Sequence, residues 1–156
     1  MADFVVLATA DWDHPLWTNK QHTALSLVEN GHRVLYVESL GLRPPRASTS
    51  DGLRIMRRIQ RILRPPRQVR RNLWVWSPAV LPGGTQGRAL ALNRGLFRMG
   101  LAFVLRLLHF HNPLLWTYNP LTRLYLAIHD FGASVYHCVD SIQDQPGMPS
   151  ALIERG

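Results

Sequence analysis

Short apolar runs alternate with longer amphipathic segments along the chain. Residues 4–8 form a continuous apolar run, which is typical of a parallel strand buried on both faces. Residues 19–30 carry leucine and valine near helical spacing, and Gly31 follows as a helix stop. A second apolar run at 33–37 completes the order strand, helix, strand, for which a right-handed crossover is expected.

The alternation continues through the rest of the chain. Asp51 is placed to cap a helix with isoleucines at steps of four and three, which two prolines end at position 65. The further elements expected are strands at 73–76, 114–118 and 133–139, and helices at 88–109 and 121–129. This order predicts an α/β fold: a Rossmann-like, open, mostly parallel sheet with helices on both faces.

The composition is that of a single folded domain, in agreement with the predicted fold. With 156 residues, 46% of them hydrophobic and 18% charged, the chain is typical of a globular domain. A single cysteine, Cys138, excludes an internal disulfide and fits a reducing compartment. The opening residues do not resemble a signal peptide, and the most apolar stretch, 99–108, is too short to span a bilayer. We expect a cytoplasmic protein, with peripheral attachment to the inner face of the membrane as an option.

Charge is distributed unevenly. The net charge is +8, and thirteen arginines but no acidic residue lie between Gly52 and His129. The helix expected at 51–64 has its arginines on polar positions around an isoleucine stripe, and the basic stretch continues to Arg71. Such a helix suits an anionic membrane surface, although an ordinary helix packed on the sheet with solvated arginines fits equally well. No recognition motif for nucleic acid accompanies the arginines, so nucleic acid is not expected as a partner. The residues assigned to a membrane surface are Arg54, Arg57, Arg58, Arg61 and Arg64.

Ligands of doubly wound sheets bind beyond the carboxyl ends of the strands, and three polar clusters follow expected strands. The loop 11–22 combines acids, amides, a lysine and two indoles, which suits a sugar, although its Asp and Thr could simply cap the next helix. Asn119 ends the fourth strand, where an Asn-Pro turn is an equal alternative, and Asp140 follows the fifth, as a general base or a simple cap. The candidate contacts for an acceptor are Trp17, Asn19, Lys20, Gln21 and Asn119.

Three segments together resemble one family. The tryptophan-containing loop after residues 4–8, the sequence GHRVLYVE at 31–38 and the sequence YHCVD at 136–140 are similar to bacterial GT-B glycosyltransferases that build surface polysaccharides, including teichuronic-acid-type enzymes. The resemblance covers nearly the whole chain in order, although its middle rests on the strand pattern. Ser141 stands where the family commonly has a second acid, so only Asp140 carries over as a catalytic candidate.

The resemblance implies two Rossmann-like domains that face each other across a cleft, one for the acceptor and one for a nucleotide-sugar. Residues 1–156 are expected to be the amino-terminal, acceptor-side domain, with the nucleotide-sugar domain absent from this chain. The expected activity is transfer of a sugar from a nucleotide-sugar to a glycan or lipid-linked acceptor. This domain alone is expected to be inactive, because it lacks the domain that binds the donor.

Two other functions remain open. A nucleotide-dependent oxidoreductase is disfavoured, because residues 8–13 lack the glycines of the dinucleotide-binding turn. A non-catalytic basic domain that docks on an anionic membrane through residues 53–71 is the other alternative. The seven histidines show no spacing typical of metal ligands, so no metal and no cofactor are expected.

Overall fold

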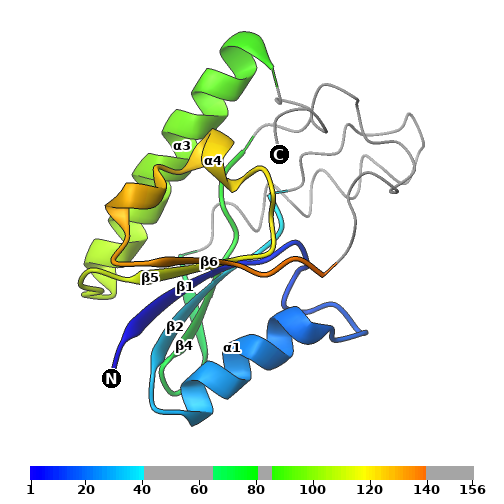
Figure 1. Cartoon of the computed structure of the whole chain (residues 1–156), viewed down its shortest axis with the longest axis vertical. Helices are drawn as coiled ribbons and strands as arrows, with labels where there is room; N and C mark the ends of the chain where they lie inside the picture. Colours follow the sequence, from blue (N-terminus) through cyan, green and yellow to red (C-terminus); the bar gives the residue numbers. More distant parts are fainter. Residues whose placement is uncertain (41–64, 81–85, 140–156) are drawn as a thin grey trace.

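Strand β1 (Asp3–Leu7) lies near the centre of a six-stranded sheet in a computed structural model that describes residues 1–40, 65–80 and 86–139 (Figure 1). The strand order is β3-β4-β2-β1-β5-β6. All neighbouring strands are parallel except β3 and β4, which form an antiparallel pair. The other strands are β2 (Arg33–Val37), β3 (Arg67–Arg70), β4 (Leu73–Trp76), β5 (Leu114–Thr117) and β6 (Ser134–Tyr136).

Helices cover both faces of the sheet. Helix α1 (Asn19–Glu29) lies on one face, and α3 (Gly87–Leu107) and the short α4 (Thr122–Tyr125) lie on the other (Figure 1). Because side chains alternate along a strand, Val6 and Val34 pack toward α1, whereas Val5 and Leu35 pack toward α3. This double coverage explains the uninterrupted apolar strands, and the expected α/β fold is confirmed.

Along the chain, the parallel strands are added first on one side of β1, as β2 and then β4, and afterwards on its other side, as β5 and then β6. The reversal falls between β1 and β5, which pair directly from Phe4 opposite Leu114 to Leu7 opposite Thr117. A crevice forms at such a reversal because the chains leaving the two strands turn to opposite faces of the sheet. The loops that follow Leu7 and Thr117 are therefore the place to search for a ligand.

The structure differs from the elements predicted from the sequence at three points. The basic stretch after the prolines, for which no strand was predicted, forms β3, which turns into β4 through Asn72 at a φ of 65°. The helix expected at 121–129 is only α4 and a separate 3-10 turn, Ile128–Asp130, because Leu126 between them is extended. The strand expected at 133–139 shortens to β6, which is exposed along its length and, among the residues that the structure describes, pairs only with β5.

Several expected features lie outside the described residues. These are the arginine-rich helix at 51–64, with Arg54, Arg57, Arg58, Arg61 and Arg64, and the candidate base Asp140. Both assignments stay predictions. Within residues 1–40, 65–80 and 86–139, no helix is long and apolar enough to cross a membrane.

Candidate functional site

A buried carboxylate anchors the long loop between β1 and α1. Glu38, directly after β2, accepts a hydrogen bond from the backbone N–H of Trp12 at 2.8 Å and another from the hydroxyl of Ser77 after β4. Tyr36, two residues earlier on the same face, donates its hydroxyl to the carbonyl of Ala10 at 3.0 Å. The loop is thereby fixed to the carboxyl ends of two neighbouring strands.

Gln21 holds the other end of this loop. Its side chain is fully buried, and its Oε1 accepts from both the backbone N–H and the hydroxyl of Thr18, each at 3.1 Å. Its Nε2 donates to the carbonyl of Asp11 at 3.0 Å. Gln21 therefore shapes the loop from inside, and it would influence a ligand through the residues that it positions.

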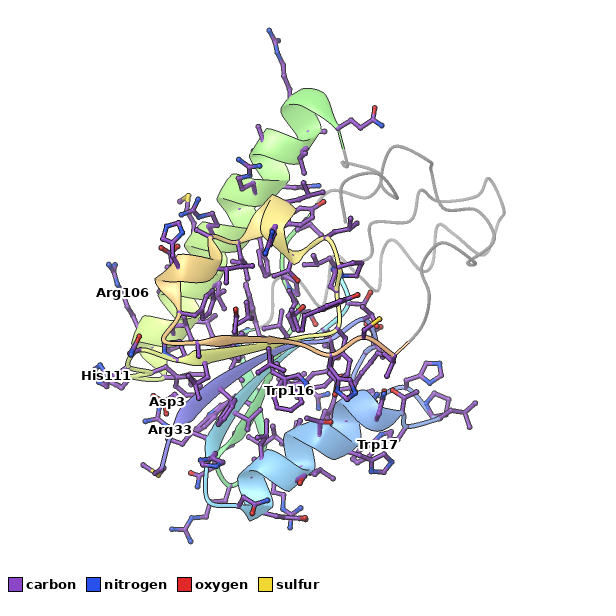
Figure 2. All side chains as sticks on the ribbon, viewed as in Figure 1. Asp3, Trp17, Arg33, Arg106, His111 and Trp116 are labelled. Carbon is purple, nitrogen blue, oxygen red and sulfur yellow. The ribbon has the colours of Figure 1, made fainter. Side chains whose placement is uncertain are left out.

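Two indoles lie one beyond the other outward from the sheet, in tilted and edge-on contacts. Trp12 is buried against Tyr36, with ring centroids 5.1 Å apart, and Trp17 rests on Trp12 at 5.0 Å. Trp17 also contacts the ring of His22 at 5.8 Å, yet 42% of its surface remains exposed. Figure 2 shows Trp17 beside the amino-terminal end of α1. An indole supported from below and exposed above is a suitable platform for the apolar face of a sugar.

A second group of side chains joins α1, β5 and β6. The Lys20 ammonium lies 5.5 Å from the centre of the Tyr118 ring, close enough for a cation–π contact. The His137 ring lies 4.8 Å from the same ring, and its Nδ1 is buried with no hydrogen-bond partner among the described residues. The Tyr118 hydroxyl donates to Thr23 of α1 at 2.7 Å. Tyr118 thus connects the lysine and the histidine.

Asn119 forms the turn that ends β5. Its backbone N–H donates to the hydroxyl of Thr117 at 3.0 Å, and its Oδ1 accepts from the N–H of Leu121 at 2.9 Å. The hydroxyls of Thr117 and Thr122 lie 2.7 Å apart and close the turn. The bond to Leu121 fixes the orientation of the buried Asn119 amide, whose Nδ2 is a hydrogen-bond donor.

The ionisation of Tyr36 is shifted by this environment. Burial raises the pKa of Tyr36 far above its ordinary value, and the charges of Glu38 and Asp11 raise it further. The hydroxyl therefore stays protonated and remains a donor to Ala10 over the whole physiological range. Tyr36 is a fixed support of the loop and has no role as a base.

The structure brings most of the expected residues to one region. Trp17, Lys20 and Gln21 lie on the β1–α1 loop or the first turn of α1, and Asn119 follows the adjacent strand β5. Asn19 is the first residue of α1 and is half-buried. Asp140 lies outside the described residues.

Sequence reasoning did not assign the supporting residues. Glu38 could have been found as a carboxylate that directly ends an apolar run, since such a position is buried at a strand end. The contacts of Tyr118 with Lys20 and His137 join three separate segments, and no local pattern signals them. Among the described residues, no three histidine, cysteine or acidic side chains gather to hold a metal ion.

Comparison with known proteins adds no family to this picture. No protein-family model matches the chain, and no curated protein is similar enough to count as a relative. A function for this chain is therefore inferred from the arrangement of residues at the strand reversal.

Proposed function

We propose that this chain is the acceptor-binding part of a glycosyltransferase that uses a nucleotide-sugar as donor. One observation carries the proposal. At the strand reversal, the exposed indole of Trp17, the Lys20–Tyr118 pair and the amide of Asn119 all lie at the carboxyl ends of the parallel strands. The resemblance of three sequence segments to GT-B glycosyltransferases supports it further.

The chemistry of these groups fits a glycan. Sugars present apolar C–H faces that stack on indoles and hydroxyls that accept from amides, so aromatic and polar groups are needed together. The Lys20 ammonium adds a positive charge, which favours an acceptor with a carboxylate or phosphate group, such as a lipid-linked glycan. The acceptor class is therefore a glycan that carries an anionic group.

Transfer also requires a base and a donor site. Asp140 is the proposed base, which would take the proton from the acceptor hydroxyl as that oxygen attacks the anomeric carbon of the donor sugar. The nucleotide leaves with the electrons of the bond that breaks. The donor site is assigned to a second Rossmann-like domain, as the resemblance implies.

A dinucleotide-dependent oxidoreductase fits the same fold less well. In that class a glycine-rich turn joins the first strand closely to the first helix, whose amino terminus binds the pyrophosphate. Here the segment from Ala8 to Thr18 contains no glycine and separates Leu7 from the start of α1 at Asn19. This loop therefore lacks the glycine-rich turn with which that class binds its cofactor.

The acceptor site is tested by titrating the chain with neutral and anionic oligosaccharides and following the intrinsic tryptophan fluorescence. Anionic glycans are expected to bind, and Trp17→Ala and Lys20→Ala should each weaken binding about tenfold, the loss of one good contact. Glu29→Gln, at the exposed far end of the same helix, is the matched control and should bind as the unmodified chain does. Equal binding by all variants would remove the site from the β1–α1 loop.

The catalytic assignment needs a separate measurement. In the protein as the cell makes it, Asp140→Asn should lower the turnover of nucleotide-sugar by about a hundredfold or more, the usual contribution of a general base. Glycan binding should be unchanged in this variant. Unchanged turnover would remove Asp140 from the mechanism while leaving the acceptor site in place.

A further inference from the structure

Helix α3 carries a second apolar face, turned away from the sheet. Its members recur at steps of four and three residues, so they form one stripe along the helix. Met99 is 74% exposed and Phe103 is 66% exposed, and the other members are also exposed. We call this stripe the outer face of α3; it consists of Leu92, Leu96, Met99, Phe103 and Leu107.

The packing of α3 on the sheet does not use this stripe. Phe97, Leu101 and Val104, on the opposite side of the helix, are buried in the core with β1 and β2 residues. None of the outer-face residues belongs to this core in the described part of the chain. Single exposed apolar residues are ordinary on protein surfaces, but a continuous stripe of large ones along a helix marks an interaction site.

The charges on α3 are all positive. The helix contains four arginines and no acidic residue. Arg94 and Arg98 reach toward the α4 region, where Arg94 donates to the carbonyl of Leu124 at 2.9 Å and Arg98 pairs with Asp130 at 3.4 Å. Arg88 lies one turn before Leu92, and Arg106 comes two turns after Met99, so both border the outer face. Figure 2 shows Arg106 extending away from the helix.

We propose that the outer face of α3 docks on an anionic lipid bilayer. The 21-residue helix, about 30 Å long at 1.5 Å per residue, would lie flat in the interface. Leucine, methionine and phenylalanine side chains would enter the boundary of the acyl chains, while Arg88 and Arg106 pair with lipid phosphates. No helix in the described part of the chain is long and apolar enough to cross the bilayer.

A second copy of the chain is a poorer occupant. Two α3 helices packed antiparallel through their outer faces would bring Arg88 of one copy near Arg106 of the other, and parallel packing would bring like residues together. No acidic side chain on the helix is present to pair with them. Anionic lipid supplies the opposite charge along the whole stripe. This inference does not depend on the proposed transfer reaction or on the arginines at 51–64.

Vesicle flotation tests the proposal with the chain as it is. The chain should float with vesicles of phosphatidylcholine containing about one third phosphatidylglycerol, and much less with phosphatidylcholine alone. Met99→Glu and Phe103→Glu should each lower the fraction bound to anionic vesicles about tenfold, since a carboxylate would have to enter the lipid boundary. Circular dichroism would confirm that both variants retain the fold, as expected for exposed positions.

Leu16→Glu is the matched control. Leu16 is 72% exposed in the β1–α1 loop on the other side of the molecule, and the variant has the same net charge as Met99→Glu. It should bind anionic vesicles like the unmodified chain. Equal losses in Leu16→Glu and Met99→Glu would overturn the proposal, because they would reflect net charge alone. No loss in Met99→Glu and Phe103→Glu would also overturn it, by placing any vesicle binding elsewhere.

A second readout locates the contact. In a chain with Cys138→Ser, which removes the single cysteine, an environment-sensitive dye on Met99→Cys should shift to the blue on anionic vesicles. The same dye on Leu16→Cys should not shift. If light scattering instead showed a dimer that Met99→Glu abolishes, and vesicles had no effect on the dye, a second copy would replace lipid as the occupant.

Discussion

The two sides of the sheet are built differently. Under α1, polar groups are enclosed with the apolar ones, and the side chains of Gln21, Tyr36 and Glu38 all have hydrogen-bond partners. Under α3, the helix packs on Val5 and Leu35 mainly through apolar side chains such as Phe97. The buried polar side chains on this side are Asn93 and the hydrogen-bonded pair Thr117 and Thr122. Buried hydrogen bonds have directional requirements that dispersion contacts lack. On the α1 side they fix the long β1–α1 loop, whereas on the other side those of Thr117 and Thr122 fix only the short turn after β5.

The two helices differ on their outer sides as well. The exposed positions of α1 include His22, Ser26 and Glu29, as expected for a helix that faces water. The exposed positions of α3 include Met99 and Phe103. The difference separates two roles on one sheet: the α1 side presents a candidate ligand site, and the α3 side presents a candidate docking surface.

The largest effect is expected from opening a cavity under α3. Phe97 is fully buried and packs against Trp76 and Tyr125, with ring centroids 6.0 and 6.4 Å away. Phe97→Ala should lower the free energy of unfolding by about 3–5 kcal/mol. Met99→Ala, two residues away on the exposed side, should change it by less than about 0.5 kcal/mol. Urea denaturation measures both, and similar losses would show that the two faces of α3 are not distinct.

A smaller loss is expected from the polar core under α1. Gln21→Ala removes three hydrogen bonds and leaves the N–H of Thr18 without its partner, so the free energy of unfolding should fall by about 2 kcal/mol. The carbonyl of Asp11 keeps its hydrogen bond from the N–H of His14 at 3.3 Å. His22→Ala, at the exposed neighbouring position, is the control and should be nearly neutral in urea denaturation. A neutral Gln21→Ala would mean that the loop does not depend on this amide.

Two buried tyrosines offer a matched pair across the sheet. The hydroxyl of Tyr36 donates to Ala10, whereas that of Tyr125 is buried with no hydrogen-bond partner among the described residues. At pH 8, Tyr36→Phe should destabilise the protein by about 1.5 kcal/mol, and Tyr125→Phe should be neutral or slightly stabilising. Equal destabilisation in urea would indicate that Tyr125 also has a partner.

The same tyrosines predict a response to alkaline pH. Burial is the main cause that raises the pKa of both groups, so the folded state keeps their protons after the unfolded chain has lost them near pH 10. The stability that the Tyr36 hydroxyl contributes is complete below pH 10 and falls as the pH rises above it. The deficit of Tyr36→Phe relative to the unmodified chain should therefore shrink between pH 8 and pH 11. Urea midpoints at the two pH values measure this change, and a constant deficit would contradict it.

The smallest effects concern the helix ends. Both α1 and α3 end with a residue in the left-handed conformation, and the backbone N–H groups of that residue and of the next one donate to carbonyls in the last turn of the helix. This residue is Gly31 after α1, at a φ of 81°, and His109 after α3, at a φ of 53°. Gly31→Ala should destabilise by about 1 kcal/mol, because a β-carbon strains this conformation. His109→Gly should stabilise by about 0.5 kcal/mol, since the relief of strain exceeds the added freedom of the unfolded chain. Thermal unfolding compares them, and effects of the same sign would contradict the common geometry.

The sequence was most informative where burial is continuous. The strands at 33–37 and 73–76 were predicted within their observed bounds, because a strand covered on both faces must be apolar throughout. β3 was missed because an exposed edge strand has no such requirement, and RQVR is also compatible with a basic helix. The short β6 was overextended for a related reason, since apolar residues near a sheet edge do not define where pairing ends.

By itself, the sequence determined the alternation of strands and helices, the mostly parallel sheet and the loops that carry polar residues. Those properties follow from local spacing and from the burial that each spacing requires. Only the tertiary structure decided that β5 returns to the side of β1, which places Lys20 against Tyr118. It also decided that Glu38 is buried where it accepts a hydrogen bond from the backbone N–H of Trp12. It also decided which apolar face of α3 meets the sheet. These outcomes depend on contacts between distant segments, whose free energies are set by packing and leave no periodic mark in the sequence.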